Sequence, residues 1–201
     1  MTVQRALTGR YIQLTETSRR VQNWDSERRT SFDSNKFYVF ESQNYLLGQN
    51  DVTIAINKEL FEVECVFFYP ASGHKYPDNL EIDCVEKKTD KKFTIVGIRI
   101  HSSATDLEKR EELSGIFDSV AEKERIILTG DFNNYRRGCV NNTWCLKELL
   151  AFSKSRGFSL YTPDGGSIYM DNNGDYSFPE DHILLRGDVI VEKLHDYDRG
   201  C

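Results

Sequence analysis

The segment 126–134 constrains this chain more than any other. An apolar run, Ile-Ile-Leu-Thr, stops at Gly130 and is followed by Asp131 and, two residues later, by Asn133. Side chains two residues apart in an extended segment lie on one face, so this pair is expected to point at one place. A carboxylate and an amide together suit a hard cation and the oxygens of a phosphate. A strand followed by an ordinary turn is the alternative, because Gly, Asp and Asn are common turn residues.

Two more carboxylates stand at the ends of apolar strands. Glu16 closes the segment 11–15, Tyr-Ile-Gln-Leu-Thr, and Asp181 opens the apolar run 183–185. A carboxylate at the mouth of a buried strand costs free energy unless it is paired or bound to a cation. Either acid alone could be an exposed acid at a strand end. Together with Asp131 and Asn133, they predict one site assembled where several strands end.

The composition indicates one folded domain. With 201 residues, of which 39% are hydrophobic, the chain is long enough to bury a sizeable core. No apolar run approaches the length that spans a membrane, and residues 1–10 lack the apolar centre of a signal peptide. We therefore expect a cytoplasmic protein without a membrane span.

The cysteines and the net charge narrow the function classes. Five cysteines without a CxxC pair argue against a zinc site or a secreted disulfide framework, so a fully reduced chain is expected. A disulfide between Cys139 and Cys145 would contradict this. The net charge of −6 disfavours a sequence-independent nucleic-acid binder, which relies on a basic surface. It still allows a metal-dependent phosphodiesterase, because bound cations offset a carboxylate-rich cleft.

Strand signals alternate with helical ones along the chain. β-branched and aromatic residues bounded by turn chemistry predict strands at 9–16, 37–40, 52–57, 61–69, 93–101, 181–185 and 189–191, besides the strand from 126. A capping box at Thr105 opens a helix that ends before 126, and a second helix is expected over 144–156. A polar loop is expected over 164–175. This order indicates a layered α/β protein in which a β-sandwich carries helices outside.

The motifs resemble, in order, those of the endonuclease/exonuclease/phosphatase superfamily. Thr-Gly-Asp-Phe-Asn at 129–133 matches its Gly-Asp-(Phe/Leu)-Asn motif, and Leu-Thr-Glu-Thr at 14–17 is similar to its metal-binding strand end. Residues 93–103 resemble the strand that carries the family's active-site His or Tyr. Glu-Asp-His-Ile-Leu-Leu at 180–185 resembles its Arg-(Ile/Leu)-Asp-Tyr-(Ile/Phe)-Leu strand. The likeness extends over residues 11–191.

The resemblance implies a fold and an activity. The fold is a four-layered α/β sandwich of two mixed β-sheets flanked by helices, formed by residues 1–201 as a single domain. The activity is hydrolysis of a phosphodiester or phosphomonoester with Mg²⁺ or Mn²⁺. The partner is therefore a phosphate-ester substrate, with nucleic acid among the candidates, and no partner protein is predicted. Substrate choice is expected to reside in the loops 17–36, 69–83 and 136–142.

The resemblance also implies roles for individual residues. The implied catalytic residues are Asp131, Asn133, His101, Arg99 and Asp181, and the implied metal ligands are Glu16, Asp131 and Asn133. Asp131 would orient or deprotonate the attacking water, and Asn133 would fix both Asp131 and the phosphate. His101 or Arg99 would stabilise the developing negative charge, and an arginine favours phosphate binding over proton transfer. Asp181 would orient a basic or histidine partner in the cleft.

The chain departs from the family pattern at both ends, so the domain is expected to be shortened there. The fifteen residues before Glu16 are expected to offer no strand bearing the family's phosphate-binding Asn, and no Ser-Asp-His motif follows residue 191. An alternative alignment makes residues 180–182 that terminal motif. Each missing phosphate donor is worth roughly 10²-fold or more, so feeble hydrolysis is expected. A catalytically impaired relative, or a fragment that acts as a binding module, is therefore the second hypothesis.

Overall fold

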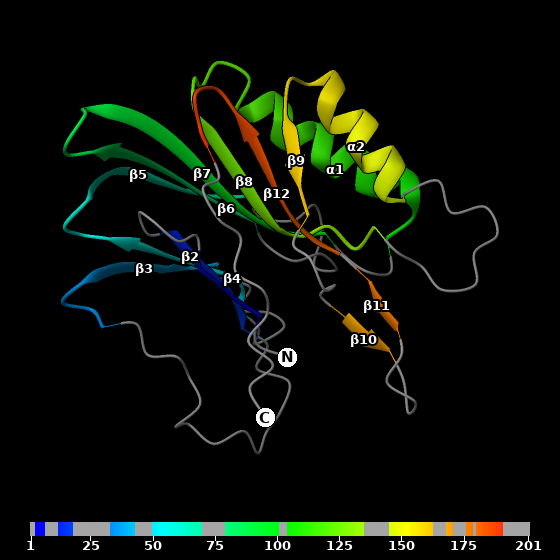
Figure 1. Ribbon diagram of the computed structural model, residues 1–201, viewed down its shortest axis with the longest axis horizontal. Helices are drawn as coiled ribbons and strands as arrows, with labels where there is room; N and C mark the ends of the chain where they lie inside the picture. Colours follow the sequence, from blue (N-terminus) through cyan, green and yellow to red (C-terminus); the bar gives the residue numbers. More distant parts are fainter. Residues whose placement is uncertain are drawn as a thin grey trace.

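The computed structural model describes residues 3–6, 12–17, 33–42, 50–69, 79–100, 104–134, 145–162, 168–170, 176–178 and 180–190. These residues form two large β-sheets, a two-stranded ribbon and two helices (Figure 1). None of the helices among them is long and apolar enough to cross a membrane.

The larger sheet has six strands in the order β5-β6-β7-β8-β12-β9. Their bounds are β5 Phe61–Tyr69, β6 Asn79–Glu86, β7 Lys91–Arg99, β8 Ile126–Asp131, β12 Asp181–Arg186 and β9 Ser159–Tyr161. Neighbouring strands are antiparallel except β7 and β8, which are parallel. A parallel pair needs a crossover, and helix α1 (Asp106–Ser119) lies in that connection. The carboxyl ends of β7 and β8 and the amino end of β12 consequently lie side by side at the same end of the sheet.

The smaller sheet has four strands in the order β1-β2-β4-β3, all paired antiparallel. Their bounds are β1 Val3–Ala6, β2 Ile12–Thr17, β4 Asn50–Asn57 and β3 Phe37–Glu41. This sheet packs on the larger one through an apolar core that includes Ile54 and Ile56 of β4 and Ile95 of β7. A glycine at position 97 allows the close approach, because a Cβ there would lie 2.4 Å from Cγ1 of Val52.

Both helices of the described residues cover the other face of the larger sheet (Figure 1). The predicted capping box opens α1, since the hydroxyl of Thr105 accepts a hydrogen bond from the N–H of Glu108. Phe117 of α1 and Leu149 of α2 (Leu146–Ser155) are buried in the core between helices and sheet. Strands β7, β8 and β12 of the larger sheet therefore lie between two apolar layers.

Two packed sheets with helices outside confirm the predicted α/β sandwich. The larger sheet is mixed, as expected, whereas the smaller sheet contains only antiparallel pairs among the described strands. Both described helices belong to one outer layer, and the part of the chain that the structure describes shows no helix on the outer face of the smaller sheet.

Strands β1 and β6 are among those that occur where none was predicted. β6 lies within and beyond the segment 69–83 that was expected to be a loop, and it pairs on both sides. Its alternation of Leu80, Ile82 and Cys84 with polar residues is a strand pattern that the acidic composition obscured. β1 precedes β2, and its sequence Val-Gln-Arg-Ala contains no Asn, so it is not the Asn-bearing strand whose absence was expected.

The carboxyl-terminal elements also differ from the prediction. The expected loop 164–175 contains β10 (Ile168–Met170), which pairs with β11 (Tyr176–Phe178). The expected strand at 189–191 is absent from residues 189 and 190, and residue 191 lies outside the description. β12 ends at Arg186 because Gly187 has a φ of 89°.

The cysteines that the structure describes carry no disulfide: Cys65, Cys84 and Cys145 are free. Because Cys139 lies outside the described residues, the expectation of a fully reduced chain stays a prediction.

A polar network lies on the helical side of β6. Glu81 is only 2% exposed and accepts a hydrogen bond from the hydroxyl of Tyr69. Asp83 accepts a hydrogen bond of 2.6 Å from Thr94 and pairs with Lys123 at 2.7 Å. Burial raises the pKa of Glu81 above its ordinary value of 4.5 and, with the Glu81 hydrogen bond, raises the pKa of Tyr69 to about 12.

Replacing Glu81 by glutamine should change the pH dependence of stability. Because the fold favours the protonated carboxyl, the stabilisation from Glu81 is complete below pH 4.5 and is lost as the pH rises through its raised pKa. Glutamine has no proton to lose. The melting temperature of Glu81→Gln minus that of the wild type should therefore grow as the pH is raised from 4.5 to neutrality. Glu62→Gln, at an exposed position of β5, is the control and should give a flat difference. A flat difference for Glu81→Gln would contradict the prediction.

Candidate active site

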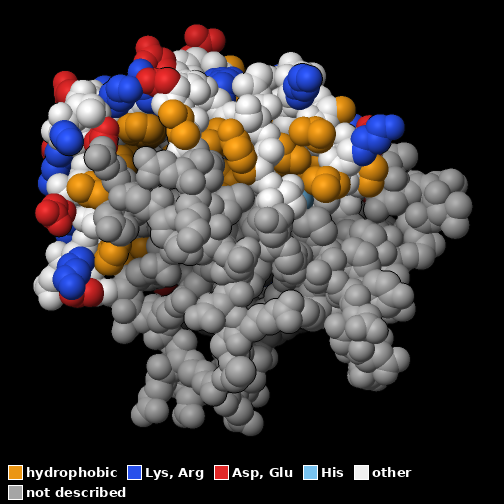
Figure 2. Space-filling model, in the orientation of Figure 1, with side chains coloured by type: hydrophobic (Ala, Val, Ile, Leu, Met, Phe, Trp, Pro, Cys, Tyr) orange, Lys and Arg blue, Asp and Glu red, His pale blue; other side chains and the backbone are white. Residues whose placement is uncertain are grey.

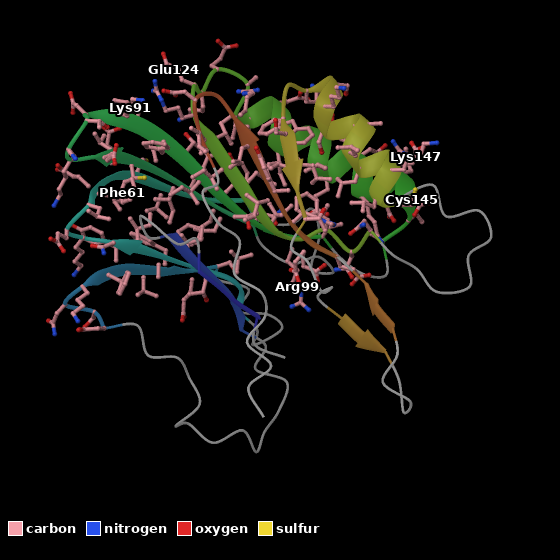
Figure 3. The ribbon with its side chains drawn as sticks, viewed as in Figure 1. Phe61, Lys91, Arg99, Glu124, Cys145 and Lys147 are labelled. Carbon is pink, nitrogen blue, oxygen red and sulfur yellow. The ribbon has the colours of Figure 1, made fainter. Side chains whose placement is uncertain are left out.

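Three of the residues predicted from the sequence form one row across the larger sheet. Strand pairing places Arg99 of β7 beside Asp131 of β8, and Asp131 beside Asp181 of β12. Neighbouring strands lie about 4.8 Å apart, and directly paired residues share a face. The row therefore places one basic and two acidic residues next to one another on the sheet. Figure 3 shows Arg99 at this end of the sheet, opposite the end marked by Lys91 and Glu124.

The row lies on the face that meets the smaller sheet. Ile127 and Ile183 stand an even number of residues from the row on the same strands, and both belong to the core between the sheets. Arg99 and Asp131 are partly exposed, whereas Asp181 is 6% exposed. Two adjacent carboxylates repel each other, and the neighbouring arginine offsets part of that repulsion. The site thus has two partly exposed residues, Arg99 and Asp131, and it lies next to the apolar core between the sheets.

A tight turn after β8 fixes Asp131. Gly130 has a φ of 147°, and a Cβ there would lie 1.9 Å from the carbonyl oxygen of Ile98. Asn133 has a left-handed φ of 43°, which asparagine tolerates better than most residues. Its N–H donates to Oδ1 of Asp131 at 2.8 Å, and its Nδ2 donates to the carbonyl of Ile100 at 2.6 Å. Asp131 and Asn133 were expected to lie on one face of an extended strand. This is wrong, because β8 ends at Asp131 and Asn133 belongs to the turn that follows.

Helix α1 contacts the turn after β8 directly and the end of β7 through a residue of β6. Nζ of Lys109 donates to the carbonyl oxygen of Asn133 at 2.7 Å. Asn79 of β6 accepts a hydrogen bond of 3.1 Å from the N–H of Arg99 and donates one of 3.0 Å to Glu112. Burial raises the pKa of Glu112, and the hydrogen bond from Asn79 opposes that rise. Sequence reasoning did not single out Lys109, Asn79 or Glu112.

For Glu16 only the backbone is described, and His101 lies outside the described residues. Glu16 lies in β2 beside a register shift between Thr15 and Thr17, and β2 contacts β8. The backbone that carries Glu16 thus runs close to the strand that carries Asp131, while its side chain is not described. The role of His101 therefore stays a prediction.

His182 lies on the opposite face of the sheet from the row. Its residue is fully buried, and its ring packs edge-on against Phe132 at 5.5 Å between ring centres. Nε2 lies 3.0 Å from Oδ1 of Asn134, and Nδ1 lies 3.0 Å from the hydroxyl of Thr162. Because the amide oxygen only accepts, Nε2 carries a proton and donates it to Asn134. This histidine is buried and has a protein partner at each ring nitrogen, so it does not fit a phosphate-binding role, which disfavours the alignment of residues 180–182 with the family's terminal motif.

The donor chemistry of the row suits a hard cation. The carboxylates of Asp131 and Asp181 in the row and the amide oxygen of Asn133 in the turn after it are oxygen donors, the type that Mg²⁺ and Mn²⁺ prefer. Among the side chains that the structure describes, no group of three or more His, Cys, Asp or Glu forms a metal site. Completion of such a site would therefore fall to Glu16.

Comparisons with known proteins give matches among solved structures. No family model and no curated protein matches the sequence. A mannosyl-6-phosphatase from Bacteroides thetaiotaomicron VPI-5482 matches with a TM-score of 0.58 and 14% identity, over 76% of this chain and 64% of that chain. An endonuclease/exonuclease/phosphatase protein from Bacteroides vulgatus matches with a TM-score of 0.54 and 14% identity, over 76% and 65%. The endonuclease domain of TRAS1, a telomere-specific non-LTR retrotransposon, matches with a TM-score of 0.54 and 15% identity, over 76% and 68%.

These matches confirm the fold that the motifs implied. The chain has the fold of the endonuclease/exonuclease/phosphatase proteins, and it spans about two thirds of the length of the chains it matches, from 64% to 68% in these three cases. At 14–15% identity the likeness extends to the fold alone, so the chemistry has to be argued from the residues of this chain.

Proposed function

We propose that this protein is a hydrolase of phosphate esters that uses Mg²⁺ or Mn²⁺ at the row Arg99, Asp131 and Asp181. The observation that carries the proposal is the register of three neighbouring strands. It brings one arginine and two aspartates together where these strands meet the turn after β8. The names of the matched structures support phosphate esters as the substrate class, since they include a sugar phosphatase and a nucleic-acid endonuclease.

The residues of the row divide the work by their chemistry. The guanidinium of Arg99 would bind two phosphate oxygens at once, which its planar fork of donors allows. Asp131, held through Oδ1 by the N–H of Asn133, would accept the proton of the attacking water or orient that water. Asp181, buried beside Asp131, would keep the arginine and the water in place through its charge.

A divalent cation fits the oxygen donors of this site. Glu16, Asp131 and Asn133 are the residues that would hold it, and when bound it would offset the charge on the phosphate and the leaving oxygen. On the face seen in Figure 2, acidic and basic side chains of the described residues are interspersed without a broad basic field. Phosphate recognition is assigned to Arg99 of the row because its planar guanidinium suits two phosphate oxygens.

Cation-dependent hydrolysis tests the proposal. The purified chain should release p-nitrophenol from bis-p-nitrophenyl phosphate or p-nitrophenyl phosphate with millimolar Mn²⁺, lose that activity with EDTA and recover it with added Mn²⁺. A short single-stranded DNA in parallel distinguishes a nuclease from a phosphatase. Mn²⁺ should also raise the melting temperature, because a ligand that binds only the native state stabilises it.

Glutamine variants locate the cation. Glu16→Gln should reduce the Mn²⁺-dependent rise in melting temperature, whereas Glu59→Gln, at an exposed turn position, should leave it unchanged. If the wild type shows neither hydrolysis nor a cation-dependent shift at millimolar concentration, the proposal is wrong and the binding-module hypothesis gains.

A further inference from the structure

Lys109 occupies a position that its charge makes unfavourable twice over. It is the fourth residue of α1, so its ammonium lies near the helix end that already carries positive partial charge. It is also only 2% exposed, and it is the one charged residue among the largest fully buried side chains of the described residues. A buried ammonium costs several kcal/mol unless its surroundings compensate the charge. A residue that breaks two local rules at once usually serves the site it touches.

The contact of Lys109 leads directly to the predicted catalytic carboxylate. Its Nζ donates to the carbonyl oxygen of Asn133 at 2.7 Å. The N–H of the same residue donates to Oδ1 of Asp131 at 2.8 Å, and the side chain donates to the carbonyl of Ile100 at 2.6 Å. Asn133 is therefore bonded at its carbonyl, its N–H and its amide group, with a left-handed φ of 43° that costs free energy in isolation.

We propose that Lys109 is a positioning residue that holds the turn 131–133, and with it the Asp131 carboxylate, in the orientation needed for phosphate-ester hydrolysis. The ammonium acts from behind the site, through the Asn133 peptide, and does not touch substrate. The expected effect of Lys109 on the hydrolysis rate rests on the proposed function. The expected effect of Lys109 on the conformation of the turn 131–133 does not.

A second contact shows that α1 supports the neighbouring strand as well. Glu112 lies three residues after Lys109 and therefore on the same face of the helix. It accepts from Asn79, which accepts in turn from the N–H of Arg99. The helix thus supports the end of β7 through Asn79 and the turn after β8 through Lys109, and the Lys109 contact is the one that leads to Asp131.

The kinetic test compares Lys109→Met with Arg110→Met. The first variant keeps the length of the side chain and removes the ammonium. The second removes a cation from the next position of α1, where Arg110 forms an ion pair of 3.2 Å with Glu148. Lys109→Met should lower kcat by roughly 10- to 100-fold with little change in KM, because misplacement of a reacting group by about 1 Å costs that much. Lys109→Arg should recover part of kcat, and Arg110→Met should retain wild-type kcat. Unchanged kcat in Lys109→Met overturns the proposal.

Hydrogen exchange separates the positioning role from the activity. Amides of a peptide that spans 131–134 should exchange faster in Lys109→Met than in the wild type, and should be unchanged in Arg110→Met. Lys109→Gln takes its place if the methionine variant does not fold. If the wild type does not hydrolyse phosphate esters, the proposed function fails while exchange still decides the positioning role. Equal exchange rates in wild type and Lys109 variants show that the ammonium does not hold the turn.

Discussion

Gly130→Ala should destabilise the fold by about 4 kcal/mol, the sum of roughly 1–3 kcal/mol for backbone strain and a similar amount for overpacking. Gly130 has a φ of 147°, which side-chain-bearing residues rarely adopt. The Cβ of an alanine would also lie 1.9 Å from the carbonyl oxygen of Ile98 on the adjacent parallel strand. Neither problem can be relieved by a side-chain rotation, because the obstacle is backbone in the centre of the larger sheet.

Gly115→Ala is the matched control for this loss. Gly115 lies within α1, and a Cβ there would meet nothing within 4 Å. Alanine is favoured over glycine inside a helix by about 1 kcal/mol, so this variant should be slightly more stable than the wild type. Urea unfolding of the two variants and the wild type measures the difference. A Gly130→Ala variant within 1 kcal/mol of the wild type would mean that β8 does not approach β7 as described.

The sequence predicted the outline of the fold because its strongest patterns are local. The apolar stripe and capping box of α1, and the apolar run of β8, are signals that neighbouring residues create together. β6 was missed for the opposite reason. Three of its positions face the helices with polar groups, which are accommodated only by partners from distant elements such as Tyr69 and Lys123. A buried acidic strand of this kind becomes recognisable once its hydrogen-bond partners are known.

The site shows the same division between local and distant information. Asp131 stood out because a glycine and a strand end lie next to it in the sequence. Asp181 stood out at the start of an apolar strand and Arg99 was assigned by resemblance, but only strand register shows that these two residues flank Asp131. Lys109 was missed although it lies four residues before Leu113 on the buried stripe of α1. A charged residue within an apolar stripe is therefore a signal that could have identified it.

Asp131→Asn should lower the hydrolysis rate by about 10³-fold, within the range of roughly 10²- to 10⁴-fold that a positioned acid or base supplies. Asparagine has nearly the same shape as aspartate, and its Oδ1 can still accept the hydrogen bond that the N–H of Asn133 gives to Asp131. The turn should consequently keep its conformation. What the variant loses is the negative charge at the centre of the row, between Arg99 and Asp181.

An aspartate elsewhere on the surface provides the control. Asp118→Asn removes an exposed carboxylate that pairs with Arg156 at 2.7 Å, and it should leave the rate unchanged. Asp181→Asn should also slow hydrolysis, and the double variant with Asp131→Asn should lose less than the product of the two single effects. Adjacent groups that act on one reaction are non-additive in this way. If Asp131→Asn keeps a melting temperature near that of the wild type and more than about a tenth of its rate, general-base or water-orienting catalysis by Asp131 is excluded, and the hydrolysis must be assigned to other residues.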